Sequence, residues 1–461
     1  MIIRADNRPF RDNPSVLGDD GSYRPVSFWQ ETVSVQPADA LTDDTRCDVV
    51  VIGGGYTGLS TAYELKRAAP NLDVVVLERA VVGHGASGRN GGFLMPLLGW
   101  NLCQTVRSLG RERAAQGYGV MYDAIDHTRA VIRAEGIDCD LEDAGYLLLA
   151  TCDKRRKHVR EEAELGRELG FDYEYLEGDA LRAHIDSDAF SAGCFDPHSS
   201  VVNPAKLARG LKDAVEGHGV RVFERTAVSA IDDGDPVIVT TEPGGTVHAR
   251  AAVVAVNGYG DALGFMKRRI LPVHTYIVLT EPLRDEALAA IGWQRRTSLE
   301  TARNFIHYFR LTADNRILFG GEDAKLFTGG RFRDSDPTSF GKLEGRLRSF
   351  FPALADVGIS HRWGGVIGVT LDMFPSFAAS GSHDNLFHGA GYSGHGVSLA
   401  NYAGKILAPA VLQRLGSDAP TVAPPRPFGR LPFKLPPRPL TYAGMQAYRF
   451  ALHAQDRWQK A

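Results

Sequence analysis

Three glycine-rich clusters carry the residue types and spacing from which a chemical role can be read. The first is Gly53-Gly54-Gly55-Tyr56-Thr57-Gly58, the second runs from Gly85 to Phe93, and the third runs from Gly389 to Gly396. Glycine lets a backbone approach a ligand closely, and exposed N–H groups bind phosphate oxygens. One such loop indicates a nucleotide. Three loops so far apart in the sequence predict one long dinucleotide that reaches from the first loop to the last.

The first cluster has the neighbours that a dinucleotide site requires. Residues 48–52 are an apolar run typical of a buried parallel strand, and residues 59–65 have the composition of a helix. Between them, Gly53, Gly55 and Gly58 have the G-x-G-x-x-G spacing. The first glycine permits a tight turn, the second admits the pyrophosphate, and the third lets the helix pack on the strand. The helix N-terminus adds unpaired N–H groups and a partial positive charge.

An acidic residue follows the second strand of this unit. Residues 72–77 form another apolar strand, and Glu78 comes directly after it. This distance from the first loop suits the acid that binds a ribose hydroxyl. A carboxylate at this position disfavours a 2′-phosphate, so the sequence argues against NADP.

The second and third clusters favour FAD over NAD. In the second cluster, Ser87, Arg89 and Asn90 supply hydrogen-bond donors. The third cluster lies between a strand-like run at 385–388 and a helix at 397–407, whose N-terminus would favour the negative charge of a reduced flavin ring. An ordinary glycine-rich loop and a simple helix start are the alternative interpretations. A nicotinamide cofactor would leave both clusters without a ligand, and the sequence therefore predicts FAD.

Longer motifs extend this pattern over most of the chain. They lie at residues 50–58, 85–93, 362–375 and 389–408, with weaker matches at 203–207, 255–259 and 271–273. With these motifs the sequence resembles the D-amino acid oxidase superfamily of FAD-dependent enzymes, and within it the γ-glutamylputrescine, glycine and sarcosine oxidases. The resemblance implies an α/β fold, in which a Rossmann-like FAD-binding domain is interleaved with an α+β substrate domain built on an antiparallel-rich sheet.

The motifs and the resemblance together assign the cofactor contacts. By resemblance, Val228 meets the adenine, Asn257 and Gly258 lie beside the pyrophosphate, and Trp363 and Gly364 lie at the isoalloxazine ring. The full set of expected FAD-binding residues is Gly53, Gly55, Tyr56, Thr57, Gly58, Glu78, Arg79, Ala86, Ser87, Arg89, Asn90, Gly91, Gly92, Phe93, Val228, Asn257, Gly258, Trp363, Gly364, Gly391, Tyr392, Ser393, Gly394, His395, Gly396 and Val397.

The resemblance also bears on how the flavin is held and reoxidised. Some relatives attach flavin through a cysteine or a histidine, but this chain has no cysteine after Cys194 and no histidine between Ser87 and Gly92. His84 lies just outside that loop, and we expect noncovalent FAD. Sarcosine oxidases place an oxygen-activating lysine where this sequence aligns Leu318, which leaves the electron acceptor open.

The implied reaction is FAD-dependent oxidative deamination of a small amine or amino acid. A hydride leaves the carbon that bears nitrogen, the product imine hydrolyses to an aldehyde or keto acid, and molecular oxygen becomes hydrogen peroxide. Three alternatives stay open: an amine dehydrogenase that passes electrons to a quinone or carrier, an oxidase of N-substituted amino acids, and a flavin-binding protein without activity.

Candidate catalytic residues lie on strands expected to face the ring. His395 lies in the third cluster, where it would tune protonation or merely hold the loop. His274 and Tyr276 alternate on one strand, as do Tyr308 and Arg310 on another, so each pair shares a face. Arg310 would clamp a carboxylate or form a surface ion pair. Two tryptophans complete the set: Trp363 is expected at the flavin and Trp29 at the pocket, with the protein core as the alternative for both.

Composition agrees with a soluble cytoplasmic enzyme. The chain has 461 residues and a net charge of −3, which predicts no strong attraction to nucleic acid or to an anionic membrane. Its five cysteines form no C-x-x-C pair, so we expect neither a metal site nor a disulfide framework. No apolar stretch approaches the roughly 18 residues of a membrane span. Oligomeric state is left open.

The motifs divide the chain into interleaved regions. We expect an N-terminal arm packed on the body at residues 1–46 and a discontinuous FAD-binding domain at 47–100, 199–262 and 360–415. Residues 101–198 and 263–359 form the expected substrate domain. Residues 416–461 combine a proline-rich extended segment with a closing helix from Tyr442 to Trp458. We expect the aromatics of this helix to pack on the body, with another subunit as the alternative.

Overall fold

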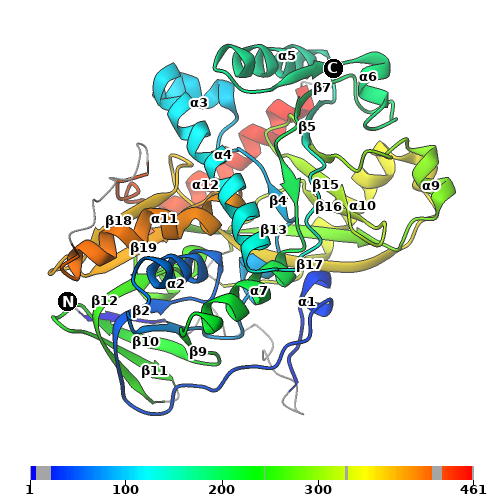
Figure 1. Cartoon of the computed structure of the whole chain (residues 1–461). Coiled ribbons are helices and arrows are strands. Elements are labelled where there is room, and N and C mark those ends of the chain that lie inside the picture. Colours follow the sequence, from blue (N-terminus) through cyan, green and yellow to red (C-terminus); the bar gives the residue numbers. More distant parts are fainter. Residues whose placement is uncertain (1, 7–21, 243, 328–330, 418–427, 459–461) are drawn as a thin grey trace.

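Two large sheets lie side by side and form the framework of the chain in this computed structural model (Figure 1). The structure describes residues 2–6, 22–242, 244–327, 331–417 and 428–458. In the described part of the chain the first sheet has nine strands and the second has eight. This arrangement agrees with the predicted α/β fold.

The first sheet has a parallel centre, because buried apolar strands pair edge to edge beneath covering helices. β12, β2, β3 and β9 are parallel, and β19 adds to β12 in the same direction. The antiparallel strands β11, β10 and β1 extend the other edge. The bounds are β1 Ile2–Arg4, β2 Thr45–Ile52, β3 Val74–Leu77, β9 Arg221–Phe223, β10 Ala227–Asp232, β11 Val237–Glu242, β12 Thr246–Val254, β18 Ser376–Ser380 and β19 Leu386–Ala390.

The second sheet is antiparallel except where β14 runs parallel to β5. Its strands, in spatial order, are β17 Ile359–Val369, β13 Leu271–Thr280, β16 Ile317–Gly321, β15 His307–Leu311, β14 Ser298–Thr301, β5 Tyr146–Ala150, β7 Ala192–Asp196 and β6 Glu174–Leu176. A short ribbon of β4 Phe93–Leu94 and β8 Ser200–Val201 lies apart from both sheets.

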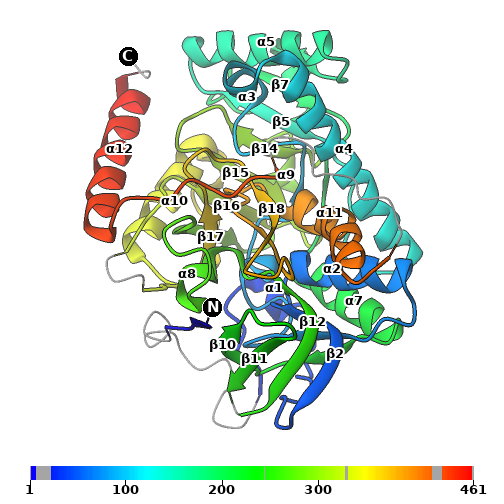
Figure 2. The same cartoon turned by 90° about the vertical axis from the view of Figure 1, so that its left-hand side faces the viewer.

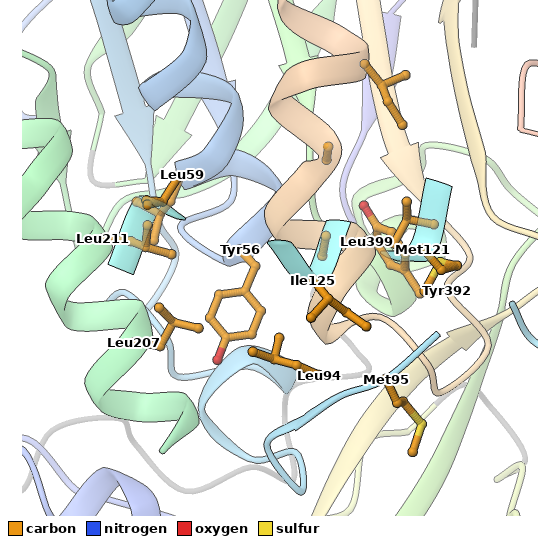
Figure 3. Packing of buried hydrophobic residues seen from close by; sticks show 14 of the residues in the cluster. Tyr56, Leu59, Leu94, Met95, Met121, Ile125, Leu207, Leu211, Tyr392 and Leu399 are labelled. Carbon is orange, nitrogen blue, oxygen red and sulfur yellow. The ribbon is translucent and has the colours of Figure 1, made fainter. Parts of the chain in front are cut away.

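Helices cover the outer faces of both sheets and fill the space between them. Their bounds are α1 Phe28–Glu31, α2 Tyr56–Ala68, α3 Leu102–Leu109, α4 Arg111–Ala134, α5 Asp153–Glu168, α6 Gly178–Arg182, α7 Pro204–Gly217, α8 Gly260–Leu263, α9 Asp285–Ala290, α10 Pro337–Phe350, α11 Val397–Arg414 and α12 Arg438–Trp458. Figure 3 shows α2, α4, α7 and α11 converging on one core, to which Tyr56, Leu207, Ile125 and Leu399 contribute.

Three expectations about organisation need correction. The predicted FAD-binding range 360–415 includes β17, but β17 lies at the edge of the second sheet. The predicted arm is more than a covering segment, because Ile2–Arg4 forms strand β1 and pairs with β10. The closing helix begins at Arg438, before the predicted Tyr442, and part of the predicted proline-rich segment (418–427) lies outside the described residues.

The last helix leaves aromatic side chains in solvent. Figure 2 shows α12 along the side of the molecule, next to α10. Arg449 pairs with Asp323 at 2.6 Å, which ties the helix to the body. Tyr448 and Phe450 are 50% and 75% exposed, so the expectation that the aromatics pack on the body is wrong for these two.

Candidate active site

A cavity of about 600 Å³ lies where the loops that follow β2, β3 and β12 meet the second sheet. The three predicted glycine clusters all contribute to its wall. The predicted cofactor residues that line it are Gly53, Gly55, Tyr56, Thr57, Glu78, Arg79, Ala86, Ser87, Arg89, Asn90, Val228, Asn257, Tyr392, Gly394, Gly396 and Val397. The cavity wall therefore combines residues that lie far apart in the sequence.

The first loop forms because glycine is required at two of its positions. Gly53 has φ +111°, which side-chain-bearing residues rarely adopt. A Cβ on Gly58 would lie 2.0 Å from the carbonyl oxygen of Gly53, so only glycine lets α2 pack this closely on the loop. The N-cap of α2 is Gly55, which has no side chain to cap the helix, and Ser87 Oγ accepts only the N–H of Tyr56 in the first turn. The start of α2 lines the cavity, where its N-terminus can bind an anion.

Glu78 lies at the end of β3, as the sequence predicts, and lines the cavity. Its carboxylate accepts the N–H of Gly54 and the N–H of Ala80, each at 2.8 Å. Burial raises the pKa of Glu78, and the two backbone donors partly offset that effect. The same carboxylate thus fixes the first loop and faces the space that a ribose would occupy.

The second loop is pinned mainly by its own side chains. Ser87 Oγ accepts the N–H of Tyr56 at 3.1 Å, which joins this loop to the start of α2. The Asn90 side chain donates to the carbonyls of Ala86 and Ser87 and accepts the N–H of Gly92 at 2.7 Å. Asn90 therefore shapes the loop more than it supplies a free donor to a ligand.

Arg89 lines the cavity, but its donors are already engaged. It pairs with Asp334 at 2.5 Å and donates to the carbonyl of His84 at 2.7 Å. It also donates to the carbonyl of Gly364. The expectation that Arg89 contacts the pyrophosphate is therefore not supported by its geometry. Its charge partner is Asp334, which no pattern in the sequence indicated.

His84 is a cavity residue that the predicted set left out. Its Nδ1 lies 3.1 Å from the Tyr23 hydroxyl, and its Nε2 lies 3.0 Å from an Arg89 guanidinium nitrogen. Burial and the positive charge of Arg89 lower the pKa of His84 to about 3, so it is neutral. Both ring nitrogens are engaged within the protein.

The third loop closes the cavity from the opposite side. Asn257 Oδ1 accepts the N–H of Gly391 at 2.9 Å, and the hydroxyls of Thr57 and Tyr392 lie 2.6 Å apart. The N-cap of α11 is Gly396, which lines the cavity and carries no capping side chain. A second uncapped helix N-terminus therefore faces the same space as that of α2.

Ten of the predicted cofactor contacts do not line the cavity. They are Gly58, Gly91, Gly92, Phe93, Gly258, Trp363, Gly364, Gly391, Ser393 and His395. His395 stands beside the lining residues Gly394 and Gly396, and its Nδ1 is buried without a hydrogen-bond partner. Burial lowers the pKa of His395 to about 4, so its imidazole is neutral at physiological pH.

The two faces of the second sheet separate the predicted catalytic pairs. Tyr276 packs against Phe340 of α10, with ring centroids 5.6 Å apart. His274 Nε2 accepts the N–H of Arg333 at 3.1 Å, and burial lowers the pKa of His274 to about 4. Neither side chain is among the residues that line the cavity, although Val366, which pairs in register with His274, does line it. Both side chains are buried, which does not support the expectation that they line a substrate pocket.

Tyr308 lies on the opposite face of the second sheet, toward the second glycine loop. Its ring meets Phe93 edge to face, with centroids 5.8 Å apart. A Cβ on Gly91 would lie 3.2 Å from the Tyr308 ring. Tyr308 therefore stays a candidate for substrate contact.

Arg310 shares that face but does not offer a free guanidinium. It is 1% exposed and donates to the carbonyl of Val202 at 2.7 Å and to those of Gly91 and Gly92 at 3.4 Å. Its guanidinium also lies 5.3 Å from the centre of the Trp29 ring. Arg310 holds the second loop in place, and the carboxylate-clamp interpretation does not fit these contacts.

Trp363 and Trp29 belong to a buried cluster that also contains Leu318. The Trp363 indole N–H donates to the carbonyl of Arg89 at 2.8 Å, and the Trp29 indole N–H donates to that of Asn90 at 2.9 Å. Both tryptophans thus support the second loop from its protein side. Both are buried and neither lines the cavity, which favours the core interpretation for both.

One group of potential metal ligands lies far from this cavity wall. Single ligand atoms of Cys103, His158 and Glu162 lie within 4.8 Å of one another. The Glu162 carboxylate accepts the N–H groups of Leu102 and Cys103 at 2.5 and 3.0 Å, and thereby caps α3. Its hydrogen bonds explain the position of Glu162 without an ion.

None of the described helices has the length and apolar character needed to cross a membrane.

The donor set fits FAD. Three features converge on one cavity: two helix N-termini whose N-cap residues are glycines, a glycine loop that tolerates no added Cβ, and an acid at the end of β3. Phosphates are bound by such N-termini, and ribose hydroxyls by such an acid. Gly53, Gly55 and the start of α2 would hold the pyrophosphate, Glu78 a ribose, Val228 the adenine, and the start of α11 the flavin.

Comparisons with known proteins agree with this geometry. The family model described as FAD dependent oxidoreductase (DAO) matches residues 48–410. The γ-glutamylputrescine oxidoreductase of Escherichia coli is 35% identical over 376 residues, which cover 81% of this chain and 85% of that protein. Glycine oxidase from Geobacillus kaustophilus superposes with a TM-score of 0.71 at 20% identity, covering 84% of this chain and 98% of that one. L-proline dehydrogenase from P. horikoshii superposes with a TM-score of 0.67 at 19% identity, covering 80% and 94%.

Proposed function

The chain belongs to the FAD-dependent oxidoreductase (DAO) family, and we propose that it oxidatively deaminates a small amine with molecular oxygen as the acceptor. Enzymes of this kind act on CH–NH or CH–NH2 groups. The observation that carries the proposal is the single cavity shared by the three glycine loops and two uncapped helix N-termini. The relative named γ-glutamylputrescine oxidoreductase favours an amine as the substrate class.

When bound, FAD would supply the redox chemistry, because it accepts a hydride, and with it two electrons, from the carbon that bears nitrogen, and passes the two electrons to oxygen, which takes up two protons to give hydrogen peroxide. The residues of the chain orient the amine and exclude water. Phe93 and Tyr308 form an aromatic wall at the second loop. An alkyl ammonium must lose a proton before its carbon can donate a hydride. The imine product then hydrolyses to an aldehyde or keto acid with release of ammonia or an amine.

We propose that FAD is held noncovalently. His84 is the histidine nearest the second loop in the sequence, and both of its ring nitrogens are already engaged with Tyr23 and Arg89. Denaturing the purified protein with acid should release the yellow colour into the supernatant. Colour that stays with the precipitate would show a covalent bond.

A dehydrogenase is the second candidate, and one observation favours it. By the family resemblance, Leu318 aligns with the oxygen-activating lysine of sarcosine oxidases, and it is fully buried among apolar side chains. Such an enzyme would share the amine half-reaction and differ only in its acceptor. An oxidase of N-substituted amino acids would differ only in its pocket.

The experiment is anaerobic reduction followed by exposure to air. Purified holoenzyme is mixed without oxygen with polyamines, γ-glutamyl amines, N-methyl amino acids and α-amino acids, while absorbance near 450 nm is followed (a general property of oxidised flavin). Bleaching by one class identifies the substrate. Rapid recovery in air supports the oxidase, whereas recovery only with a quinone supports the dehydrogenase. A yellow protein that no amine bleaches would refute the amine reaction.

A further inference from the structure

Glu300 is a buried carboxylate on the face of the second sheet that looks toward the second glycine loop. It pairs in register with Tyr308 on β15 and with Leu148 on β5, so the three side chains share that face. Leu299, the neighbour of Glu300 in sequence, points the other way, into the cluster beneath α10. Tyr308 in turn touches Phe93, which follows the second loop. Glu300 therefore lies one strand away from the aromatic wall described above.

This carboxylate has no positively charged partner among the residues that the structure describes. Glu300 is 5% exposed, and burial raises its pKa to about 8, with the Tyr146 hydroxyl partly offsetting the effect. The titratable groups around it are Tyr146 on β5, Tyr308 on β15 and, behind Tyr146, Cys194 on β7. All are neutral or acidic. An uncompensated buried carboxylate is costly, and proteins retain one mainly where a ligand or a reaction uses it.

The cations that would recognise a carboxylate-bearing substrate are committed elsewhere. Arg310, on the same face, donates to four backbone carbonyls. Arg89 pairs with Asp334 and with two backbone carbonyls. This part of the molecule thus offers an acidic group and aromatic rings, while both arginines are engaged with backbone carbonyls or with Asp334. Carboxylates and aromatic faces both attract ammonium groups.

We propose that Glu300 binds the positively charged amino group of the substrate, so that this enzyme prefers cationic alkyl amines to α-amino acids. This inference rests on the proposed amine oxidation and specifies its substrate class. An ammonium group that enters beside Glu300 favours the ionised carboxylate and removes the cost of the unpaired buried group. The rings of Tyr146 and Tyr308 flank the same position and favour the cation further.

The test compares a charged ligand with its uncharged counterpart. Butylamine and 1-butanol are titrated into anaerobic holoenzyme, and the change in flavin absorbance that precedes any bleaching gives each dissociation constant. At pH 8 the wild type should bind butylammonium at least about tenfold more tightly than butanol, the size of effect expected for one charge-assisted contact. Below pH 8 ammonium binding must expel the proton of Glu300, so affinity should fall by about tenfold per pH unit.

Glu300→Gln should remove both the preference for the cation and its pH dependence, while the flavin content and spectrum stay unchanged. Glu344→Gln is the matched control, because Glu344 lies on α10, across the sheet, where it pairs with Arg362. Glu300→Met serves as a second variant if the glutamine protein folds poorly. Glu344→Gln should bind both ligands as the wild type does.

The outcomes separate this inference from the proposed function. A cation preference that survives in Glu300→Gln, or that the wild type lacks, overturns the assignment of Glu300, even if amines bleach the flavin. A preference that depends on Glu300 in a protein that no amine bleaches supports the binding site and refutes amine oxidation. If glycine at low concentration bleached the flavin of the wild type and of Glu300→Gln equally, the enzyme would accept an α-amino acid without help from Glu300. That result would also overturn the assignment.

Discussion

Replacing Gly58 with alanine tests whether the first loop binds FAD through the close contact between helix and loop. The new Cβ would lie 2.0 Å from the carbonyl oxygen of Gly53 and 3.1 Å from Val51 Cγ1. Since carbon and oxygen atoms in contact normally lie about 3.3 Å apart, α2 must move by roughly 1 Å. Overpacking of this kind costs about 1–3 kcal/mol. If the strain falls on the bound state, the FAD dissociation constant should rise by about 5-fold to 150-fold.

The assay is titration of apoprotein with FAD, followed by quenching of flavin fluorescence. Gly345→Ala is the control, because Gly345 lies within α10 and an added Cβ there meets no atom within 4 Å. That variant should bind FAD normally and gain about 0.5–1 kcal/mol of stability, since alanine is the better helix former. Wild-type FAD affinity in Gly58→Ala would refute the argument that this contact places the helix N-terminus at the pyrophosphate.

Three further predictions test other parts of the site. Glu78→Gln should weaken FAD binding by about tenfold or more in the same fluorescence titration, because hydrogen bonds to a charged group contribute about 1.5–3 kcal/mol; unchanged affinity would remove Glu78 from the site. Arg310→Lys should lower the melting temperature of apo- and holoprotein alike, since Arg310 holds backbone carbonyls; a raised KM for carboxylate-bearing substrates with normal melting would instead restore the clamp interpretation. Burial lowers the pKa of His388 to about 3 and that of His395 to about 4, below the unfolded value near 6.5. The contribution of these two histidines to stability is therefore complete above pH 6.5 and is lost as the pH falls toward 4. Urea unfolding between pH 4.5 and 7 should show this loss, by up to about 1.4 kcal/mol per pH unit for each histidine, and His388→Gln should flatten the slope.

Local patterns explain the part of the fold and site that could be predicted from the sequence. The turn from β2 to α2 is specified by glycines a few residues apart, and Glu78 directly follows an apolar strand, so the sequence contains their whole context. The same holds for the start of α11 after the third cluster. Among them, Gly53, Gly55, Glu78, Gly396 and Val397 line the cavity.

The parts of the fold and the site that the sequence did not predict depend on contacts between segments that lie far apart in the chain. The alternation of His274 with Tyr276 shows that they share a face, but both faces of the second sheet are buried, so burial and polarity do not reveal which one meets the cavity. The partner of Arg89, Asp334, lies far along the chain, and nothing near Arg89 in sequence indicates that its charge is already neutralised. Strand β1 has only three residues, and its pairing with β10 has no local signature.

The composition of the cavity wall has a consequence for biosynthesis. The wall begins at Ala5 and ends at Ala400, and the parallel sheet beneath it is incomplete until β19 pairs with β12. A growing chain therefore leaves backbone N–H and C=O groups along one edge of β12 unpaired while more than a hundred further residues are translated. Cofactor loading must follow the synthesis of α11. During translation, the nascent chain must be protected by its own early helices or by chaperones, because bound FAD is not yet available to stabilise it.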